Sequence, residues 1–377
     1  MNFIRTALAS FFAILIYTLP FYSSIYIKAG LVITLISLCF LDILRKKSLS
    51  LIWQESFMFL FFIMVITRYS LSGLYTQSQL STIIFNYITP FFMLFTVRRL
   101  WKAKFDWLVL GYAYLAGCIT ATIILVYKWI VEGAATRLSI GELNANYVSY
   151  CLVTGVVVGL TLTLLSKNKF QIRVLVATLA ILFIGILLGG TRGSLISILG
   201  LLIGFSFFRF RRNPFKITIL SIAAISFGIF LFNIIPESVS SRILSDSSTG
   251  DVTSGRSYLW SLAVSYISES PLTGYGIGYF KYNNASGIEV HNVFLSILVE
   301  FGIVGLLFYV PVLFSIIFIK HKSLEVMQAR IFFIVSWLPI AMTGVWEYSM
   351  AAWFVFAWLI YVPPELHDNP VRKKNYN

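Results

Sequence analysis

Charged residues, histidines and cysteines are all scarce in this chain of 377 residues. Asp, Glu, Lys and Arg make up 12% of it, and it has three histidines and three cysteines. Soluble domains average about 25% charged residues, so this composition excludes an ordinary soluble domain. Because Cys39, Cys118 and Cys151 all lie inside apolar runs, the sequence offers no disulfide framework and no metal-thiolate spacing.

Hydrophobic residues account for 58% of the chain, and its mean hydropathy is +0.86. A helix needs about 20 apolar residues to cross a bilayer, and runs of that kind recur almost without interruption. The sequence therefore predicts an all-α, polytopic membrane helical bundle with about 12 transmembrane helices. The predicted spans are 7–22, 29–44, 51–67, 81–97, 107–131, 147–166, 172–188, 195–208, 217–235, 293–319, 331–345 and 350–362. The first run has no small-residue cleavage site, so we expect it to be an uncleaved anchor.

Basic residues, which give the chain its net charge of +14, gather at every second boundary between the predicted spans. This distribution predicts that both termini are cytoplasmic. We expect no nucleic-acid binding, because the basic residues flank spans and form no separate domain. We predict helices one to nine in 1–235, a large polar loop in 236–292, helices ten to twelve in 293–363 and a cytoplasmic tail in 364–377.

The polar loop contains two patterned stretches. From Arg256, the apolar residues Leu259, Leu262, Ala263 and Tyr266 recur at three- and four-residue spacing, which predicts an amphipathic helix on the membrane face. The following SPLTGYGIGYF has glycines at alternate positions, but no strand precedes it and no helix-opening lysine follows. We therefore predict a tight turn or re-entrant structure there and no phosphate loop.

Arginines on the non-cytoplasmic side are exceptions to the usual charge distribution, and three of them are candidate ligands for an anion. Arg192 lies among glycines in GGTRGS, Arg137 in TRLSIGELNAN and Arg256 in GRSYLW. A guanidinium binds phosphate through two parallel hydrogen bonds, and flanking glycines let backbone N–H groups approach an anion. The alternatives are a snorkelling side chain for Arg192 and a helix-cap contact for Arg256. Near Arg137, Asn144 and Asn146 can cap the next helix.

His291 is the one histidine on the predicted outer side, at the entrance of the span beginning at 293. An unperturbed pKa near 6.5 suits it to accept a proton at neutral pH. The alternative is a helix-terminal histidine that only hydrogen-bonds the loop. With no second histidine, Cys pair or Asp cluster outside, we expect neither a metal nor another cofactor.

Five features in a fixed order resemble the O-antigen ligase and O-antigen polymerase family. They are RLSIGELNANYVSY, GTRGSL, GRSYLW, SPLTGYGIGYF and HNVFLSILVEFGIVGLLFY, spanning 137 to 309. The resemblance implies a glycosyltransferase C-type membrane enzyme acting on undecaprenyl diphosphate-linked glycan, with its site on the periplasmic face of the bacterial inner membrane. It assigns Arg192, Arg256 and Arg137 to the diphosphate and makes His291 the general base. A threonine precedes Arg192 where the family more often has serine.

The family resemblance leaves the acceptor open. Polymerisation of O-antigen or another surface polysaccharide uses a second lipid-linked glycan, with a chain-length regulator as a partner, whereas ligation uses the lipid A core. The short loop before His291 favours polymerisation. A flippase for lipid-linked glycan is a third interpretation, but it requires charges deep within several spans, where Lys128 is the main candidate.

Overall fold

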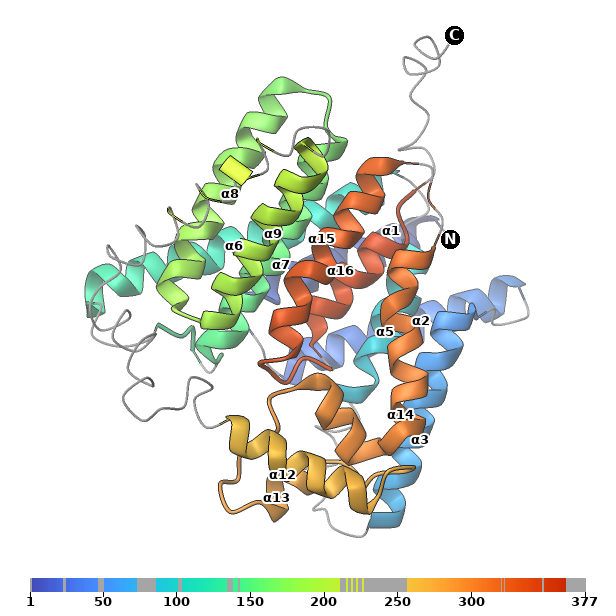
Figure 1. Cartoon of the computed structure of the whole chain (residues 1–377). Coiled ribbons are helices and arrows are strands. Elements are labelled where there is room, and N and C mark those ends of the chain that lie inside the picture. The colour runs from blue at the N-terminus through green and yellow to red at the C-terminus, as the bar shows by residue number, and fades with distance from the viewer. Residues whose placement is uncertain are drawn as a thin grey trace.

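The computed structural model describes residues 2–22, 25–46, 51–72, 86–100, 104–133, 138–141, 143–210, 256–319, 321, 323–347 and 349–363, together with isolated positions between 215 and 226. Throughout these residues the regular secondary structure is helical, apart from one isolated bridge between Ile140 and Leu143. The helices in Figure 1 are α1 (Asn2–Thr18), α2 (Ile25–Lys46), α3 (Trp53–Ser72), α5 (Thr89–Leu100), α6 (Lys104–Glu132), α7 (Ala145–Leu165), α8 (Lys169–Gly189), α9 (Arg192–Phe210), α12 (Arg256–Glu269), α13 (Tyr279–Asn283), α14 (Val293–Phe318), α15 (Leu324–Ala341) and α16 (Met350–Ile360).

Polar side chains begin many of these helices by accepting hydrogen bonds from backbone N–H groups of the first turn, which have no partner within the helix. The capping residues are Asn144, Asn168, Asn292, Ser323 and Ser349. The predicted cap at Asn144 is confirmed, with its Oδ1 2.9 Å from the backbone nitrogen of Asn146.

The core of the bundle is built around α7 and α16. α7 packs against α6, α8, α9, α15 and α16, and every residue of α16 is buried. Trp107 of α6 and Trp358 of α16 stack with ring centroids 3.9 Å apart, and each indole nitrogen donates to the other residue's carbonyl at 2.9 Å. A buried indole needs such a partner, so this pair fixes α6 against α16 without an unsatisfied donor.

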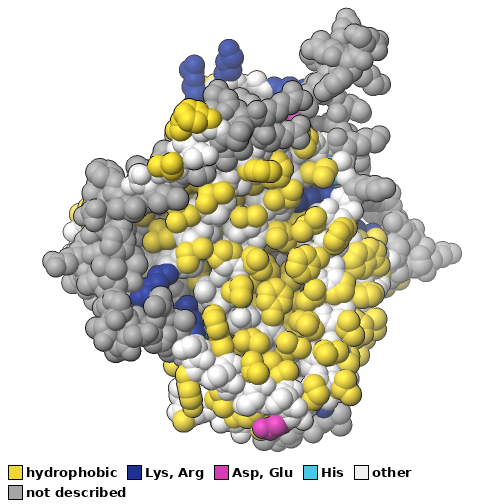
Figure 2. Space-filling model, in the orientation of Figure 1, with side chains coloured by type: hydrophobic (Ala, Val, Ile, Leu, Met, Phe, Trp, Pro, Cys, Tyr) yellow, Lys and Arg dark blue, Asp and Glu magenta, His cyan; other side chains and the backbone are white. Residues whose placement is uncertain are grey.

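The outer surface of the bundle is apolar. Figure 2 shows hydrophobic side chains over much of the visible face, with few charges among them. Exposed apolar side chains occur on several helices, including Ile33, Val176 and Leu307. Among the residues that the structure describes, five helices are long and apolar enough to cross a membrane, namely α6, α7, α8, α14 and α15. A surface of this kind is stable only in lipid, and the chain is an integral membrane protein.

The predicted count of about 12 membrane spans is wrong for the part of the chain that the structure describes. Besides the five long spans, four shorter apolar helices occur within α1, α2, α9 and α16. α5 has 12 residues and α16 has 11, which at 1.5 Å per residue gives about 18 Å against a hydrocarbon core of about 30 Å. Most of the predicted ninth span, 217–235, lies outside the described residues.

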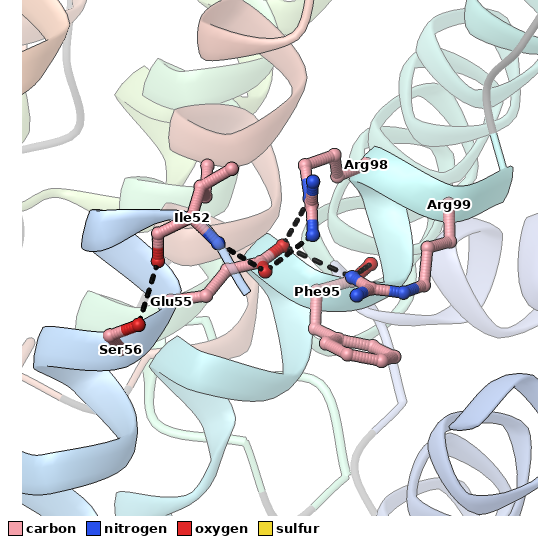
Figure 3. A network of polar contacts seen from close by, with 6 residues as sticks. All are labelled: Ile52, Glu55, Ser56, Phe95, Arg98 and Arg99. Carbon is pink, nitrogen blue, oxygen red and sulfur yellow. Dashed lines mark hydrogen bonds and ion pairs between the residues drawn. The ribbon is translucent and has the colours of Figure 1, made fainter. Parts of the chain in front are cut away.

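A buried ion cluster joins α3 to α5 (Figure 3). The Glu55 carboxylate is fully buried and accepts hydrogen bonds from Arg98 at 2.5 and 2.7 Å and from Arg99 at 3.2 Å. The Arg99 guanidinium also lies 3.2 Å from the centroid of the Phe95 ring. The two arginines of α5 therefore contact the neighbouring helix α3 and balance a charge inside the bundle.

Candidate active site

α12 and α13 lie side by side at one end of the bundle, below the long helices in the view of Figure 1. The predicted helix from Arg256 is present, and its Leu259 and Ala263 are buried where α12 packs against α14. Trp260 of α12 donates its indole N–H to the carbonyl of Val290 at 3.2 Å. This bond holds the start of α12 against the segment that leads into His291.

His291 has a left-handed backbone with φ of 54°, and no other non-glycine residue in the described part of the chain has positive φ. A bulky residue in this region costs about 1–3 kcal/mol and persists only where surrounding contacts impose it. Asn292 imposes it here, because its side chain caps α14 by accepting from the nitrogens of Phe294 and Leu295 at 3.1 and 3.2 Å. The half-buried imidazole therefore lies at the N-terminal end of α14.

Burial lowers the pKa of His291 below its usual 6.5, and the positive charge of Arg256 lowers the pKa further. Lys281 acts in the same direction, whereas the Glu289 carboxylate opposes them. Lys281 and Glu289 are themselves paired at 3.1 Å. Arg256 therefore lies close enough to His291 to affect its charge state, and the imidazole is neutral at pH 7 and able to accept a proton.

The start of α14 is separated from the rest of that helix by a break at Gly302, which has φ of 61° and ψ of −162°. The carbonyls of Val299 and Glu300 accept instead from the nitrogens of Tyr275 and Gly276, both at 2.8 Å. Beyond the break, the nitrogens of residues 303 and 304 donate to the carbonyls of residues 271 and 272 at 2.8 and 3.1 Å. The turn predicted in SPLTGYGIGYF is thus inserted into a broken membrane helix, with its backbone groups paired across the break.

Side chains on both sides fasten this inserted turn. The buried Glu300 carboxylate accepts from the Tyr87 hydroxyl at 2.6 Å and from the backbone nitrogen of Gly278 at 2.8 Å. The Arg68 guanidinium donates to the carbonyl of Gly274. Because both oxygens of Glu300 accept hydrogen bonds that fix the inserted turn, we assign this acid a structural role.

Arg192 is the first residue of α9 and is partly exposed. Gly190, with φ of 56°, caps the C-terminal end of α8, and the hydroxyls of Thr191 and Ser194 hydrogen-bond each other at the start of α9. Among the glycines that flank Arg192, only Gly190 has a left-handed backbone. Gly193 is needed for close packing, because a Cβ there would lie 2.7 Å from Thr343 Oγ1 and 2.8 Å from the Tyr150 hydroxyl.

The connection between α15 and α16, residues 342–349, contacts both the start of α9 near Arg192 and the start of α14 near His291. Thr343 shares a hydrogen bond of 3.2 Å with Tyr150, beside Gly193. Further along, Glu347 accepts from Ser296 Oγ at 3.0 Å on the first turn of α14. Sequence reasoning missed Glu347, although an acid at the predicted outer end of an apolar run is a signal of function.

Arg137, one of the three candidate arginines, lies outside the described residues, as does Arg242 in the predicted polar loop. The segment that follows Arg137 is described from Leu138 onward. In it, Ile140 and Leu143 form a bridge and are buried. The described site therefore comprises His291 with Arg256 beside it, and Arg192 at the far end of the 342–349 connection.

Comparison with known proteins finds a similarity in the part of the chain that carries the site. Residues 177–310 match a family model described as O-antigen ligase. This segment is similar to the O-antigen ligase family domain. The domain contains Arg192, Arg256 and His291, and it ends before Glu347. The resemblance read from the sequence is confirmed.

Two curated relatives extend beyond the O-antigen ligase domain. A protein of Rickettsia conorii named "Putative polysaccharide ligase" is 22% identical over 285 aligned positions, which cover 67% of each chain. A protein of Rickettsia felis with the same description is 24% identical over 285 positions, again with 67% of each chain covered. The domain and these relatives support glycan transfer within a membrane as the class of reaction.

Proposed function

We propose that this protein is an inverting glycosyltransferase that moves glycan from undecaprenyl diphosphate to a hydroxyl acceptor at the periplasmic face of the inner membrane. One observation carries the proposal. Within an O-antigen ligase domain, a neutral, partly buried histidine on a strained backbone lies next to an arginine at one end of a membrane bundle. A base beside a cation suits a reaction in which a proton is lost while an anion leaves.

In the proposed reaction the acceptor oxygen attacks the anomeric carbon, and the bond from that carbon to the diphosphate oxygen breaks. The diphosphate leaves with the electron pair, and His291 takes the hydroxyl proton. Arg256 and Arg192 stabilise the charge that grows on the diphosphate, and each such donor contributes about 3 kcal/mol in a shielded site. Direct attack inverts the anomeric configuration. Arg137 is a third proposed phosphate ligand, from its place in the sequence motif.

Two acceptors each have support. The short outer segment before His291 favours polymerisation, in which the acceptor is another lipid-linked repeat and a chain-length regulator is the expected partner. The description of the family and the names of the Rickettsia relatives favour ligation, in which the acceptor is the lipid A core. Both reactions share the donor, the base and the diphosphate ligands.

His291→Ala should lower glycan transfer by about 10²–10⁴-fold while the protein still folds, because general base catalysis contributes that much. The measurement is product formation by purified protein in detergent, from a synthetic polyprenyl diphosphate glycan and a matching acceptor. His321→Ala is the matched control, since His321 hydrogen-bonds the nitrogen of Ser323 at the start of α15, and it should keep the wild-type rate. Near-normal transfer by His291→Ala would remove the base assignment.

The same assay separates an enzyme from a flippase, because a transporter forms no new glycosidic bond in detergent solution. Glycan analysis of a deletion strain then separates the two acceptors. Loss of polymer with single repeats still on lipid A core indicates a polymerase. Polymer that accumulates on the polyprenyl carrier indicates a ligase.

A further inference from the structure

Glu347 is a buried acid held in one orientation by its own backbone. Its carbonyl accepts from the Tyr309 hydroxyl at 3.0 Å and from the Trp353 indole at 2.8 Å. The side chain then reaches the first turn of α14, where Ser296 Oγ donates to Oε1 at 3.0 Å. Oε2 is also buried, and within the described structure no hydrogen bond reaches it. An acid in this state is costly to keep unless it has a task.

Glu347 lies between the part of the site at His291 and the part at Arg192. Ser296 lies one turn from Asn292, to whose carbonyl its nitrogen donates at 2.8 Å, and Asn292 directly follows His291. On the other side, Thr343 of the same connection contacts Tyr150 and the space above Gly193, next to Arg192. The Glu347–Ser296 bond therefore closes a chain of contacts between His291 and Arg192.

The charge state of Glu347 decides how well this bond holds. Burial raises the pKa of Glu347 to about 8, and the charges of Glu300 on α14 and Glu289 near His291 contribute in the same direction. Tyr309 is the other titratable group that contacts Glu347, through its carbonyl. At pH 7 the carboxyl is mostly neutral, and above pH 8 a negative charge forms in the interior, where the backbone of Glu347 itself and Ser296 offset the cost of burial only in part.

We propose that Glu347 is a positioning residue for glycan transfer, which sets the spacing between His291 and Arg192 through its hydrogen bond to Ser296. The inference rests on the proposed function. Ionisation of Glu347 loosens the first turn of α14, so the transfer rate falls as the pH rises through about 8.

The test compares Glu347→Gln, Glu347→Ala, Ser296→Ala and the double alanine variant in full-length protein, with kcat and KM for the donor measured from pH 5.5 to 9.5. Glutamine keeps an acceptor for Ser296 and cannot ionise, so Glu347→Gln should retain the neutral-pH rate and lose the decline near pH 8. Glu347→Ala should lower kcat by about tenfold with little change in KM, the typical effect of one lost buried hydrogen bond. The double variant should be no slower than Glu347→Ala, because both substitutions remove the same contact.

Several results would overturn the proposal. Loss of activity in Glu347→Gln equal to that in Glu347→Ala would mean that the charge itself is required. Additive losses in the double variant, or an unchanged alkaline limb in Glu347→Gln, would show that the Ser296 bond does not act on the site. If Glu347→Ala does not fold, the glutamine and serine variants decide the question.

A readout independent of activity separates this inference from the proposed function. Spin labels at Ile196 on α9 and Ile288 before His291, both exposed, report the spacing of the two turns in protein whose native cysteines have been replaced. The distance distribution should broaden in Glu347→Ala and stay narrow in Glu347→Gln. Absence of transfer by the wild-type protein would count against the proposed function, whereas an unchanged distribution in Glu347→Ala would overturn the positioning role.

Discussion

At the scale of single residues, the site depends on one strained and desolvated histidine. The left-handed backbone of His291 is imposed by the Asn292 cap, and its pKa is set by burial first and by Arg256 second. A base with a lowered pKa stays neutral to more acidic pH, although each proton transfer to it is less favourable. The charged pair Lys281–Glu289 lies close enough to adjust this balance without taking part in the chemistry.

The acidic limb of the pH–rate profile should therefore move in opposite directions in two variants. The rate falls as the pH drops through the pKa of His291, because the imidazolium cannot accept a proton. Glu289→Gln removes a charge that raises this pKa, so its limb should shift to lower pH, and Lys281→Met removes one that lowers the pKa, so its limb should shift to higher pH. The measurement is kcat/KM against pH, and shifts in the same direction would contradict the assignment of these charges to His291.

At the scale of elements, the broken helix α14 and the turn inserted into it are one unit. Glycine is required at two points where backbones meet, because a Cβ on Gly274 would lie 2.5 Å from the carbonyl carbon of Glu300, and one on Gly302 would approach the backbone of Leu272. Both residues also have positive φ. The unit sets where the His291 end of α14 lies relative to the membrane-spanning half.

Gly302→Ala and Gly274→Ala should each destabilise the protein by more than about 3 kcal/mol, since they add a backbone clash to the strain of positive φ. Gly287→Ala is the matched control. Its φ is 62°, close to that of both, but nothing lies within 4 Å of the added Cβ. The control should lose only about 1 kcal/mol. Thermal unfolding in detergent measures the difference, and equal losses in all three would show that the close approach is not tight.

The ion cluster between α3 and α5 should matter more than an exposed ion pair. Glu55→Gln removes the negative charge that Arg98 and the 7%-exposed Arg99 side chain contact. We expect a loss of about 2–4 kcal/mol, which is somewhat less than the loss for breaking a fully buried pair because Arg98 is partly solvated. Glu132→Gln is the control, because its pair with Lys128 is exposed and contributes about 0.3–0.5 kcal/mol. Similar unfolding temperatures for the two variants would contradict this ranking.

At the scale of the whole molecule, the long apolar helices serve to hold a small polar assembly at one end of the bundle. That end contains α12, α13, the start of α14 and the 342–349 connection (Figure 1). The proposed reaction requires this end to face the periplasm. The distribution of basic residues along the chain predicts the same orientation, since basic clusters lie on the cytoplasmic side.

Cysteine labelling in intact cells tests this orientation. In a background without the native cysteines, Tyr282→Cys in the outer segment should react with a membrane-impermeant maleimide before lysis. Phe170→Cys, at the start of α8 beside a basic cluster, should react only after lysis. Both positions are exposed, at 59% and 72%, so the difference reports the side of the membrane. The reverse pattern would invert the topology.

The sequence predicted the class of fold and much of the candidate site. Long apolar runs can satisfy their backbone in lipid only as helices, so composition alone leads to a membrane bundle. Local patterns also predicted the α12 helix from its apolar spacing and the turn between residues 270 and 280. The count of spans was wrong because apolar length does not separate a spanning helix from a short, wholly buried one such as α16.

Only the tertiary structure decided what depends on residues far apart in the chain. It placed Arg256 beside His291, inserted the glycine-rich turn into α14 at Gly302 and put Glu347 against Ser296. Each of these contacts joins segments from different helices, and their energy comes from burial and from pairing across the break. Sequence periodicity records which face of a segment is apolar, but the partner that covers that face is chosen by packing in three dimensions.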